Sequence, residues 1–244
     1  MHKPEDYFLK IEKSVGRAIN RYSLIKENDR VVVALSGGKD SFVMLETISE
    51  RRKRLPVYYE VTAVYVHIKN IGYETDRVFL KSFCESLNVP LHIIETEADL
   101  DRDKSKAICF ICSWHRRKIL FDFVKQEKFN KLALGHHMDD AIETLLMNMI
   151  SNGSMSSMPP SLSMFRGEFD LIRPLILLTE DEIEQYAKLK KFSSQIKTCP
   201  YASGTGRASV KKLVREMSLI DENARKNIFN AMSNIHSEYL PSDD

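Results

Sequence analysis

The chain has 244 residues, of which 43% are hydrophobic and 29% charged, a balance that fits one sizeable α/β domain or one domain with a modest appendage. This composition excludes a disordered or fibrous class, because a chain of this length can bury a real core. The formal net charge is only +2, so any contact with nucleic acid must come from local basic clusters.

Strands and helices alternate along the first two thirds of the chain. Apolar residues recur at three- and four-residue steps over 5–28, which predicts an amphipathic helix, and VVVAL at 31–35 is typical of a buried parallel strand. Alternating elements predict parallel βαβ units in an α/β fold with a doubly wound parallel sheet. Further helices are expected at 41–54, 74–87, 112–127 and 139–150, and further strands at 60–68, 91–95 and 131–135.

The alternation ends after residue 150. Residues 151–160 have the composition of a loop, and the following strands at 161–175 read as a hairpin with Gly167 in its turn. Thr179 is a plausible N-cap for a helix that ends near Lys191, and two more helical stretches follow. We therefore expect an N-terminal helix (1–28), an α/β domain (29–178) and a C-terminal helical extension (179–244).

The N-terminal residues alternate charged with apolar side chains and lack a stretch of signal-peptide length. Later segments also fall short of the ~20 apolar residues of a spanning helix. The sequence therefore predicts a cytoplasmic protein that does not enter a membrane.

A glycine pair follows the first strand, in the run SGGKDS at 36–41. In an open α/β sheet, ligands bind beyond the carboxyl ends of the strands, so this loop stands where a phosphate would bind. Two glycines permit a tight turn in which several backbone amides point at one anion, and Lys39 adds a positive charge. The run predicts a nucleotide-binding loop, and a plain turn between strand and helix is the alternative.

The loop differs from the phosphate-binding motif of kinases and GTPases, which needs a glycine where Val33 lies inside the strand. The run S-G-G-x-D-S after a hydrophobic strand resembles instead the signature of the PP-loop ATP pyrophosphatases. The resemblance implies an adenine nucleotide alpha hydrolase-like fold. It also implies an enzyme that cleaves ATP between the α- and β-phosphates, adenylates a substrate oxygen and lets a nucleophile displace AMP.

A second polar motif, GHHMDD at 135–140, ends the strand at 131–135 and begins a helix. Asp139 and Asp140 could hold Mg²⁺ or a nucleotide edge, and capping of the helix is the alternative. His136 and His137 stand at the carboxyl end of the strand, which favours a site. The motif resembles that of the PP-loop group that modifies tRNA.

The cysteine pair C-x-x-C at 109–112 opens the helix before the strand at 131–135, and Cys199 follows in a glycine-rich loop. Two such thiolates can share one metal or cluster. A zinc site needs four ligands, and the fourth could come from His92, His115 or His136. Three cysteines would suit a [4Fe-4S] cluster with one iron left open. Cys84 reads as a helix residue packed on the sheet.

The order and spacing of these segments resemble the TtcA family of 2-thiocytidine-type tRNA thiolases, up to about residue 235. The matching segments are SGGKDS, C-x-x-C-S-x-x-R-R, ALGHH-x-DD, MPP at 158–160, IRPL at 172–175 and the late cysteine loop. The resemblance implies a [4Fe-4S] cluster on Cys109, Cys112 and Cys199, whose open iron binds the sulfur to be transferred. Ala202 stands where the family usually has a fourth cysteine, which weakens the zinc alternative.

These motifs predict roles for specific residues. Lys39 is expected to stabilise the leaving pyrophosphate, Asp40 or Asp139 to hold Mg²⁺, and Arg116 to steady the adenylate. The predicted ATP-binding residues are Ala34, Leu35, Ser36, Gly37, Gly38, Lys39, Asp40, Ser41, His67, Gly135, His136 and Asp140.

Basic residues provide candidate contacts to tRNA. The run Arg51–Arg54 at a helix end is explained by a solvated face, with tRNA contact as the alternative. Better candidates for phosphate contacts lie near the third cysteine: Arg207, Lys211, Lys212 and Arg215.

The predicted function is that of an ATP-dependent tRNA sulfurtransferase that adenylates a pyrimidine C2 oxygen and replaces it with sulfur. ATP, Mg²⁺ and a [4Fe-4S] cluster are the expected cofactors, and tRNA and a sulfur donor such as a cysteine desulfurase or free sulfide the partners. The family resemblance further suggests cytidine and a homodimer. The alternatives are lysidine-type amination, thiolation of a small molecule, and a non-catalytic metal- or cluster-bearing RNA-binding or sensor protein.

Overall fold

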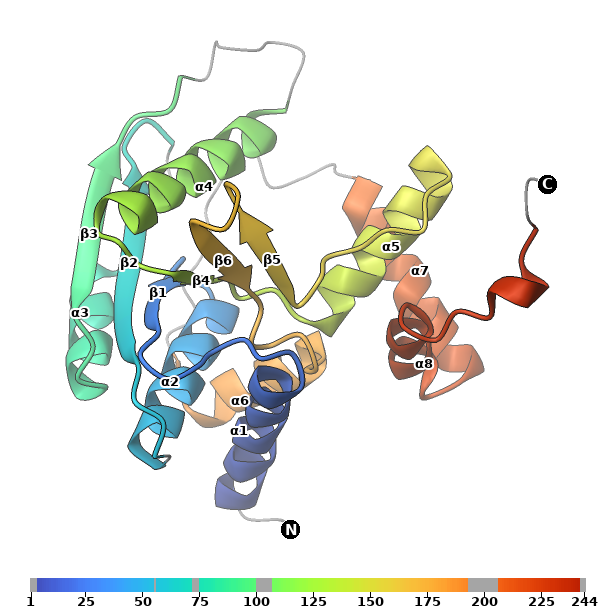
Figure 1. Ribbon diagram of the computed structural model, residues 1–244, viewed down its shortest axis with the longest axis horizontal. Helices are drawn as coiled ribbons and strands as arrows, with labels where there is room; N and C mark the ends of the chain where they lie inside the picture. Colours follow the sequence, from blue (N-terminus) through green and yellow to red (C-terminus); the bar gives the residue numbers. More distant parts are fainter. Residues whose placement is uncertain (1–3, 55, 72–74, 100–106, 193–205, 242–244) are drawn as a thin grey trace. The chain divides into compact units, whose positions relative to one another are not determined.

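The computed structural model describes residues 4–54, 56–71, 75–99, 107–192 and 206–241 (Figure 1). Its strands are β1 (Arg30–Ala34), β2 (Glu60–Ile68), β3 (Leu91–Thr96), β4 (Lys131–Ala133), β5 (Ser161–Met164) and β6 (Phe169–Ile172). Its α-helices are α1 (Pro4–Arg21), α2 (Lys39–Arg54), α3 (Arg77–Ser86), α4 (Ile108–Gln126), α5 (Met138–Asn152), α6 (Glu180–Leu189), α7 (Gly206–Ile220) and α8 (Ala224–Ala231). A short 3₁₀ helix covers Ser237–Tyr239.

The described residues form two compact units. The first comprises those of Met1–His137 and Pro159–Ser203 and contains the sheet, and the second comprises those of Met138–Met158 and Gly204–Asp244 and contains α5, α7 and α8. The division at residues 28 and 178 that the sequence suggested stays a prediction.

The sheet of the first unit has the strand order β3-β2-β1-β4-β6-β5. Strand β1 pairs in parallel with β2 on one side and with β4 on the other, and Val33 is opposite Ala63 and Ala133. Among the described strands, β5 alone runs antiparallel to its neighbour, β6. Since β1, β2 and β4 point the same way, their carboxyl ends meet at one edge of the sheet, where ligands of such folds bind.

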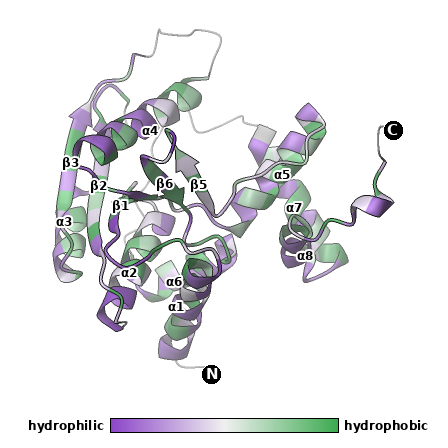
Figure 2. Ribbon diagram, in the orientation of Figure 1, coloured by the Kyte–Doolittle hydropathy of each residue, from purple (hydrophilic) through white to green (hydrophobic). Residues whose placement is uncertain are grey.

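Helices cover both faces of this sheet (Figure 1). Helix α4 packs Leu120 and Val124 against a core that includes Val32, Val64 and Leu132. On the opposite face α2 buries Phe42 against two phenylalanine rings of α3, and α1 and α6 lie against α2. Figure 2 shows that α1 carries both hydrophobic and hydrophilic residues, as expected for a helix with one buried face.

The α/β fold with a largely parallel sheet is confirmed, as are the strand at 60–68 and the hairpin with Gly167 in its turn. The N-terminal helix is shorter than predicted. It ends at Arg21, and Ser23 and Asn28 adopt positive φ angles of 50° and 64°. Leu24 and Ile25 continue the apolar pattern beyond the helix because this loop also packs into the core.

Thr179 caps α6 as the sequence predicted. Its hydroxyl accepts a hydrogen bond from the amide of Glu182, and the Glu182 carboxylate accepts one from the amide of Thr179, which completes a capping box. No helix within the described ranges combines the length and the hydrophobicity needed to cross a bilayer.

Replacing the cap tests this assignment. The variant Thr179→Ala loses the acceptor for the Glu182 amide, so we expect a loss of about 1 kcal/mol and a fall in Tm of about 2–4 °C. Ser82→Ala is the matched control, because that exposed hydroxyl bonds only to a carbonyl one turn back in α3. An unchanged Tm for Thr179→Ala in thermal unfolding would show that the cap is not stabilising.

Candidate active site

The loop after β1 is closed by two serines. The Ser41 hydroxyl donates to the carbonyl of Gly38 at 2.8 Å and accepts a hydrogen bond from the amide of Ser36 at 3.2 Å. The Ser36 hydroxyl accepts from the Gly38 amide at 3.3 Å, and Gly37 adopts a φ of 77° that favours glycine. Helix α2 begins at Lys39, so its first amides lack intrahelical partners. The loop is therefore held in a defined shape by its own hydrogen bonds, and phosphate binding by its residues stays a prediction.

Lys39 lies between two carboxylates. Its Nζ is 3.1 Å from Oδ1 of Asp40 and 3.6 Å from Oε1 of Glu180, the first residue of α6. Partial burial works to lower the pKa of Lys39, but the two carboxylates more than offset this and raise that pKa above its ordinary value. Lys39 therefore stays an ammonium ion at neutral pH and can neutralise a phosphate.

Gly135 lies directly against this loop. A Cβ built on Gly135 would be 3.3 Å from the carbonyl carbon of Asp40 and 3.4 Å from the amide nitrogen of Ser41. Those distances are tighter than ordinary packing and both neighbours are backbone atoms, so a side chain here would push on the loop. Gly135 thus supports the loop from behind, and a direct contact between Gly135 and ATP stays a prediction.

Helix α4 brings Arg116 to the same edge. A small, mostly apolar pocket of about 50 Å³ is lined by Ala34, Leu35 and Ser36 from the end of β1, by β2, and by Arg116 and Leu120 of α4. His67, the next-to-last residue of β2, is 9% exposed. The pocket is lined both by predicted ATP-binding residues at the end of β1 and by the predicted catalytic Arg116. The roles of these residues stay predictions.

The cysteine pair occupies the first turn of α4. The helix begins at Ile108, four residues earlier than predicted, so Cys109 and Cys112 are three positions apart on one helical face. Cys112 packs against a small apolar cluster of Ile68, Ile71 and Ala98, and Ile68 is the last residue of β2. A helix N-terminus favours anionic ligands such as thiolates, and both side chains are partly exposed.

These two cysteines fit a thiolate-ligated cluster. Cys199 and Ala202 lie outside the described residues, and within those residues no three His, Cys, Asp or Glu side chains are grouped to hold a metal ion. Cys84 is buried, and burial together with Glu85 raises the pKa of its thiol to about 11, which agrees with a packing role.

The aspartates of the second motif are held by arginines within the second unit. Arg207 of α7 places Nη2 2.5 Å from Oδ1 of Asp140 and Nε 2.7 Å from Oε2 of Glu143. Arg225 of α8 lies 3.3 Å from Oδ1 of Asp139. Asp139 and Glu143 are 4% and 5% exposed, so these are largely buried charges that require partners.

These ion pairs concern the predicted tRNA-binding role of Arg207 and the predicted roles of Asp139 and Asp140. The guanidinium of Arg207, expected to bind tRNA, already contacts two carboxylates in α5, which gives it a structural role. Lys212 and Arg215 are exposed on α7, and Lys211 is partly exposed. The tRNA role of all four basic residues, and the catalytic and ATP-binding roles of Asp139 and Asp140, stay predictions.

The sequence alone did not identify Glu180, Glu143 and Arg225 as partners of the predicted site residues. An acidic first turn in α6 is ordinary capping chemistry, so nothing local places Glu180 beside Lys39. Glu143 did leave a signal: with Asp139 and Asp140 it makes α5 acidic on one side without a basic residue in the helix. Such a stripe requires cations from elsewhere in the chain.

Comparisons with known proteins agree with this site. A family model described as a PP-loop domain matches residues 9–196. The tRNA-cytidine(32) 2-sulfurtransferase of Shewanella oneidensis is 38% identical over 230 residues, which cover 92% of this chain and 74% of that protein. The protein of the same name from Paraburkholderia phymatum is 34% identical over 238 residues, which cover 96% of this chain and 70% of that one.

A solved structure resembles the chain over nearly its whole length. The U34-tRNA thiolase NcsA from Methanococcus maripaludis, solved with its [4Fe-4S] cluster, superposes with a TM-score of 0.79 at 26% identity. The match covers 98% of this chain and 82% of that one.

A side chain at residue 135 is expected to disturb the loop. In Gly135→Ala the new Cβ meets the backbone of Asp40 and Ser41, so we expect ATP to bind about tenfold more weakly by calorimetry. The control is Gly153→Ala, whose Cβ has no atom within 4 Å and whose positive φ adds only local strain. Equal ATP affinity in the two variants would contradict the supporting role of Gly135.

Loss of Arg207 should loosen the second unit. Arg207→Ala removes one partner from the buried Glu143 and from Asp140, but the Arg207 side chain is 40% exposed, so we expect a loss of only about 1–2 kcal/mol in the free energy of unfolding. Faster hydrogen exchange of the α7 amides would show this loss of stability. Lys212→Ala, which breaks an exposed pair with Glu216 on the same helix, should leave the exchange of the α7 amides unchanged. Unchanged exchange combined with weaker tRNA binding in Arg207→Ala would instead assign this residue to tRNA.

Proposed function

Because the chain belongs to the PP-loop family and, within it, to the tRNA-cytidine(32) 2-sulfurtransferases, we propose that it is an ATP-dependent tRNA thiolase that replaces a cytidine C2 oxygen with sulfur. The arrangement of residues on helix α4 is the observation that best supports this proposal. Helix α4 holds the cysteine pair in its first turn and Arg116 one turn beyond Cys112, and Arg116 lines a pocket with the end of β1. At 1.5 Å per residue, Cys112 and Arg116 are about 6 Å apart along the helix.

The first step activates the cytidine. The C2 oxygen attacks the α-phosphorus of ATP, a new P–O bond forms, and pyrophosphate leaves with the electron pair of the broken bond. The Ser36–Ser41 loop binds the phosphates through its backbone amides, and the Lys39 ammonium offsets the charge that develops on pyrophosphate. Asp40 would hold Mg²⁺, which would supply positive charge to the phosphates.

The second step installs sulfur. A sulfide nucleophile adds to C2, and the C2–O bond breaks so that the oxygen departs in AMP. A [4Fe-4S] cluster on Cys109, Cys112 and Cys199 would supply an iron without a protein ligand, on which sulfur can be held. Arg116 is four residues beyond Cys112 in α4 and lines a pocket with Ser36, so its guanidinium could steady the negatively charged adenylate.

The substrate and partners follow from this chemistry. The target cytidine must leave its base stack to expose C2, so a loop nucleotide of tRNA is the appropriate substrate. The sulfur comes from free sulfide, or from a cysteine desulfurase whose persulfide sulfur is released as sulfide by a two-electron thiol reductant. The enzyme works as a homodimer, and its tRNA substrate places the reaction in the cytoplasm. Amination of the activated carbon would need no cysteines, so the pair on α4 favours thiolation.

Removing one thiolate should separate sulfur transfer from ATP binding. In anaerobically purified Cys112→Ser we expect the absorbance near about 400 nm and the bound iron to fall, and thiolated cytidine to decrease at least about a hundredfold. The ATP dissociation constant should change less than about twofold, because the loop is intact.

Cys84→Ala is the matched control and should keep the iron, the absorbance and the thiolation, since Cys84 is a buried packing residue. Full thiolation by Cys112→Ser would refute the role of the cysteine pair, whereas loss of both ATP binding and iron would point to misfolding and is tested by the Tm.

A further inference from the structure

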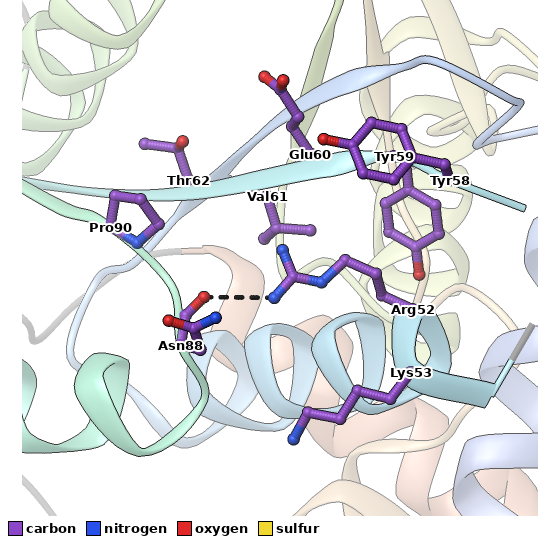
Figure 3. Close-up of a pocket in the computed structure, with 9 residues that line it drawn as sticks. All are labelled: Arg52, Lys53, Tyr58, Tyr59, Glu60, Val61, Thr62, Asn88 and Pro90. Carbon is purple, nitrogen blue, oxygen red and sulfur yellow. Dashed lines mark hydrogen bonds between the residues drawn. The ribbon is translucent and has the colours of Figure 1, made fainter.

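A second cavity lies at the amino end of β2, far from the loop after β1. It has a volume of about 510 Å³ and lies between the end of α2, the start of β2 and the turn before β3 (Figure 3). Because β1 and β2 are parallel and start together at Arg30 and Glu60, this cavity is at the sheet edge opposite the Ser36–Ser41 loop. Helix α2 connects the two edges with 16 residues, or about 24 Å. We call it the amino-end pocket.

The pocket is open because β2 extends past its neighbour. Strand β3 begins at Leu91, opposite Ala63, and the Ala63 amide donates to the carbonyl of Pro90. Among the described strands, none pairs with Glu60–Thr62 on this side. The unpaired strand edge forms the floor of a cavity whose volume is within the range of small-ligand sites.

One cation in the wall of the pocket has no carboxylate partner among the described residues. In the basic run that ends α2, Arg54 pairs with Glu12 and Lys53 pairs with Glu50. Arg52 donates Nη2 to the carbonyl oxygen of Asn88 at 3.2 Å, and within the described residues it forms no ion pair (Figure 3).

The carboxylate in the pocket wall is already neutralised. Glu60 pairs with Arg30 at 3.0 Å, so it does not compensate Arg52. The wall is therefore positive, and a planar guanidinium with free donor capacity suits a phosphate.

An exposed aromatic ring stands beside this cation. Tyr58 is 58% exposed, yet its backbone is fixed at both ends: its amide donates to Glu27 and its carbonyl accepts from the Asn28 amide. A ring on a fixed backbone can stack on a base at low entropic cost. A phosphate group and an aromatic base occur together in a nucleotide.

We propose that the amino-end pocket binds one nucleotide of the tRNA, with a phosphate on Arg52 and the base on Tyr58. This inference rests on the proposed function, since it makes the pocket a second contact for the substrate. The distance of about 24 Å along α2 separates it from the nucleotide being modified, so it would bind a different nucleotide of the same tRNA.

The test measures tRNA affinity of the full-length protein as a function of salt. In Arg52→Gln we expect about tenfold weaker binding and a slope of log K against log salt that is smaller by about 0.7–0.9, the contribution of one phosphate contact. Tyr58→Ala should weaken binding about tenfold with an unchanged slope, because stacking releases no counterions. Lys188→Gln, which removes an equally positive but ion-paired surface residue of α6, should leave both quantities unchanged.

The controls separate this inference from the proposed function. ATP affinity and Tm should match those of the unmodified protein in both variants, since Arg52 and Tyr58 lie away from the ATP loop. If the unmodified protein bound no tRNA, the proposed function itself would fail. If it bound tRNA and both variants bound it equally well, only the amino-end pocket would be refuted. Unchanged tRNA affinity with loss of cytidine 5′-monophosphate binding in Arg52→Gln would also overturn the proposal and assign the pocket to a free nucleotide.

Discussion

The parallel pairing of β1 between β2 and β4 is the constraint on which the first unit depends. It brings the ends of three strands to one edge, so the SGGKDS loop, His67 and Gly135 reach the same place from distant parts of the chain. The approach is so close that a single Cβ on Gly135 would meet the backbone of Asp40. Helix α4 packs on the face of this sheet, and its Cys112 lies against an apolar cluster that includes Ile68, the last residue of β2. Adenylation and sulfur delivery can therefore act on one bound base.

The carboxylates that surround a cation indicate whether it has a structural role or is available to a ligand. Lys39 is held by Asp40 and Glu180, which keep it protonated and fixed at the phosphate loop. In the second unit the carboxylates are the groups that require partners. Largely buried carboxylates of α5 pair there with arginines of α7 and α8. Arg52 differs from both cases, since its partner is a neutral carbonyl. Because no carboxylate of the described residues pairs with Arg52, we propose that it binds an anion from outside the protein.

Local patterns predicted much of this structure, and long-range contacts explain what they could not predict. The strand at 60–68, the cap at Thr179 and the closed loop at 36–41 each depend on neighbours within a few residues, which periodicity and capping rules describe. The contact of Lys39 with Glu180 joins residues about 140 positions apart, and no local pattern encodes it. Arg207 reads as an RNA-binding residue in the sequence because its carboxylate partners lie in another helix. Cys199 lies outside the described residues, so its place in the cluster rests on resemblance.

The central claim is that the loop at the end of β1 activates the same C2 oxygen that sulfur replaces. An isotope experiment tests it most directly: tRNA labelled with ¹⁸O at C2 of the target cytidine is incubated with ATP, sulfide and anaerobically purified protein, and the products are weighed by mass spectrometry. The mechanism predicts one ¹⁸O in AMP, none in pyrophosphate, and one AMP for each thiolated cytidine. Thiolated cytidine formed with unlabelled AMP, or with the label released to water, would contradict it.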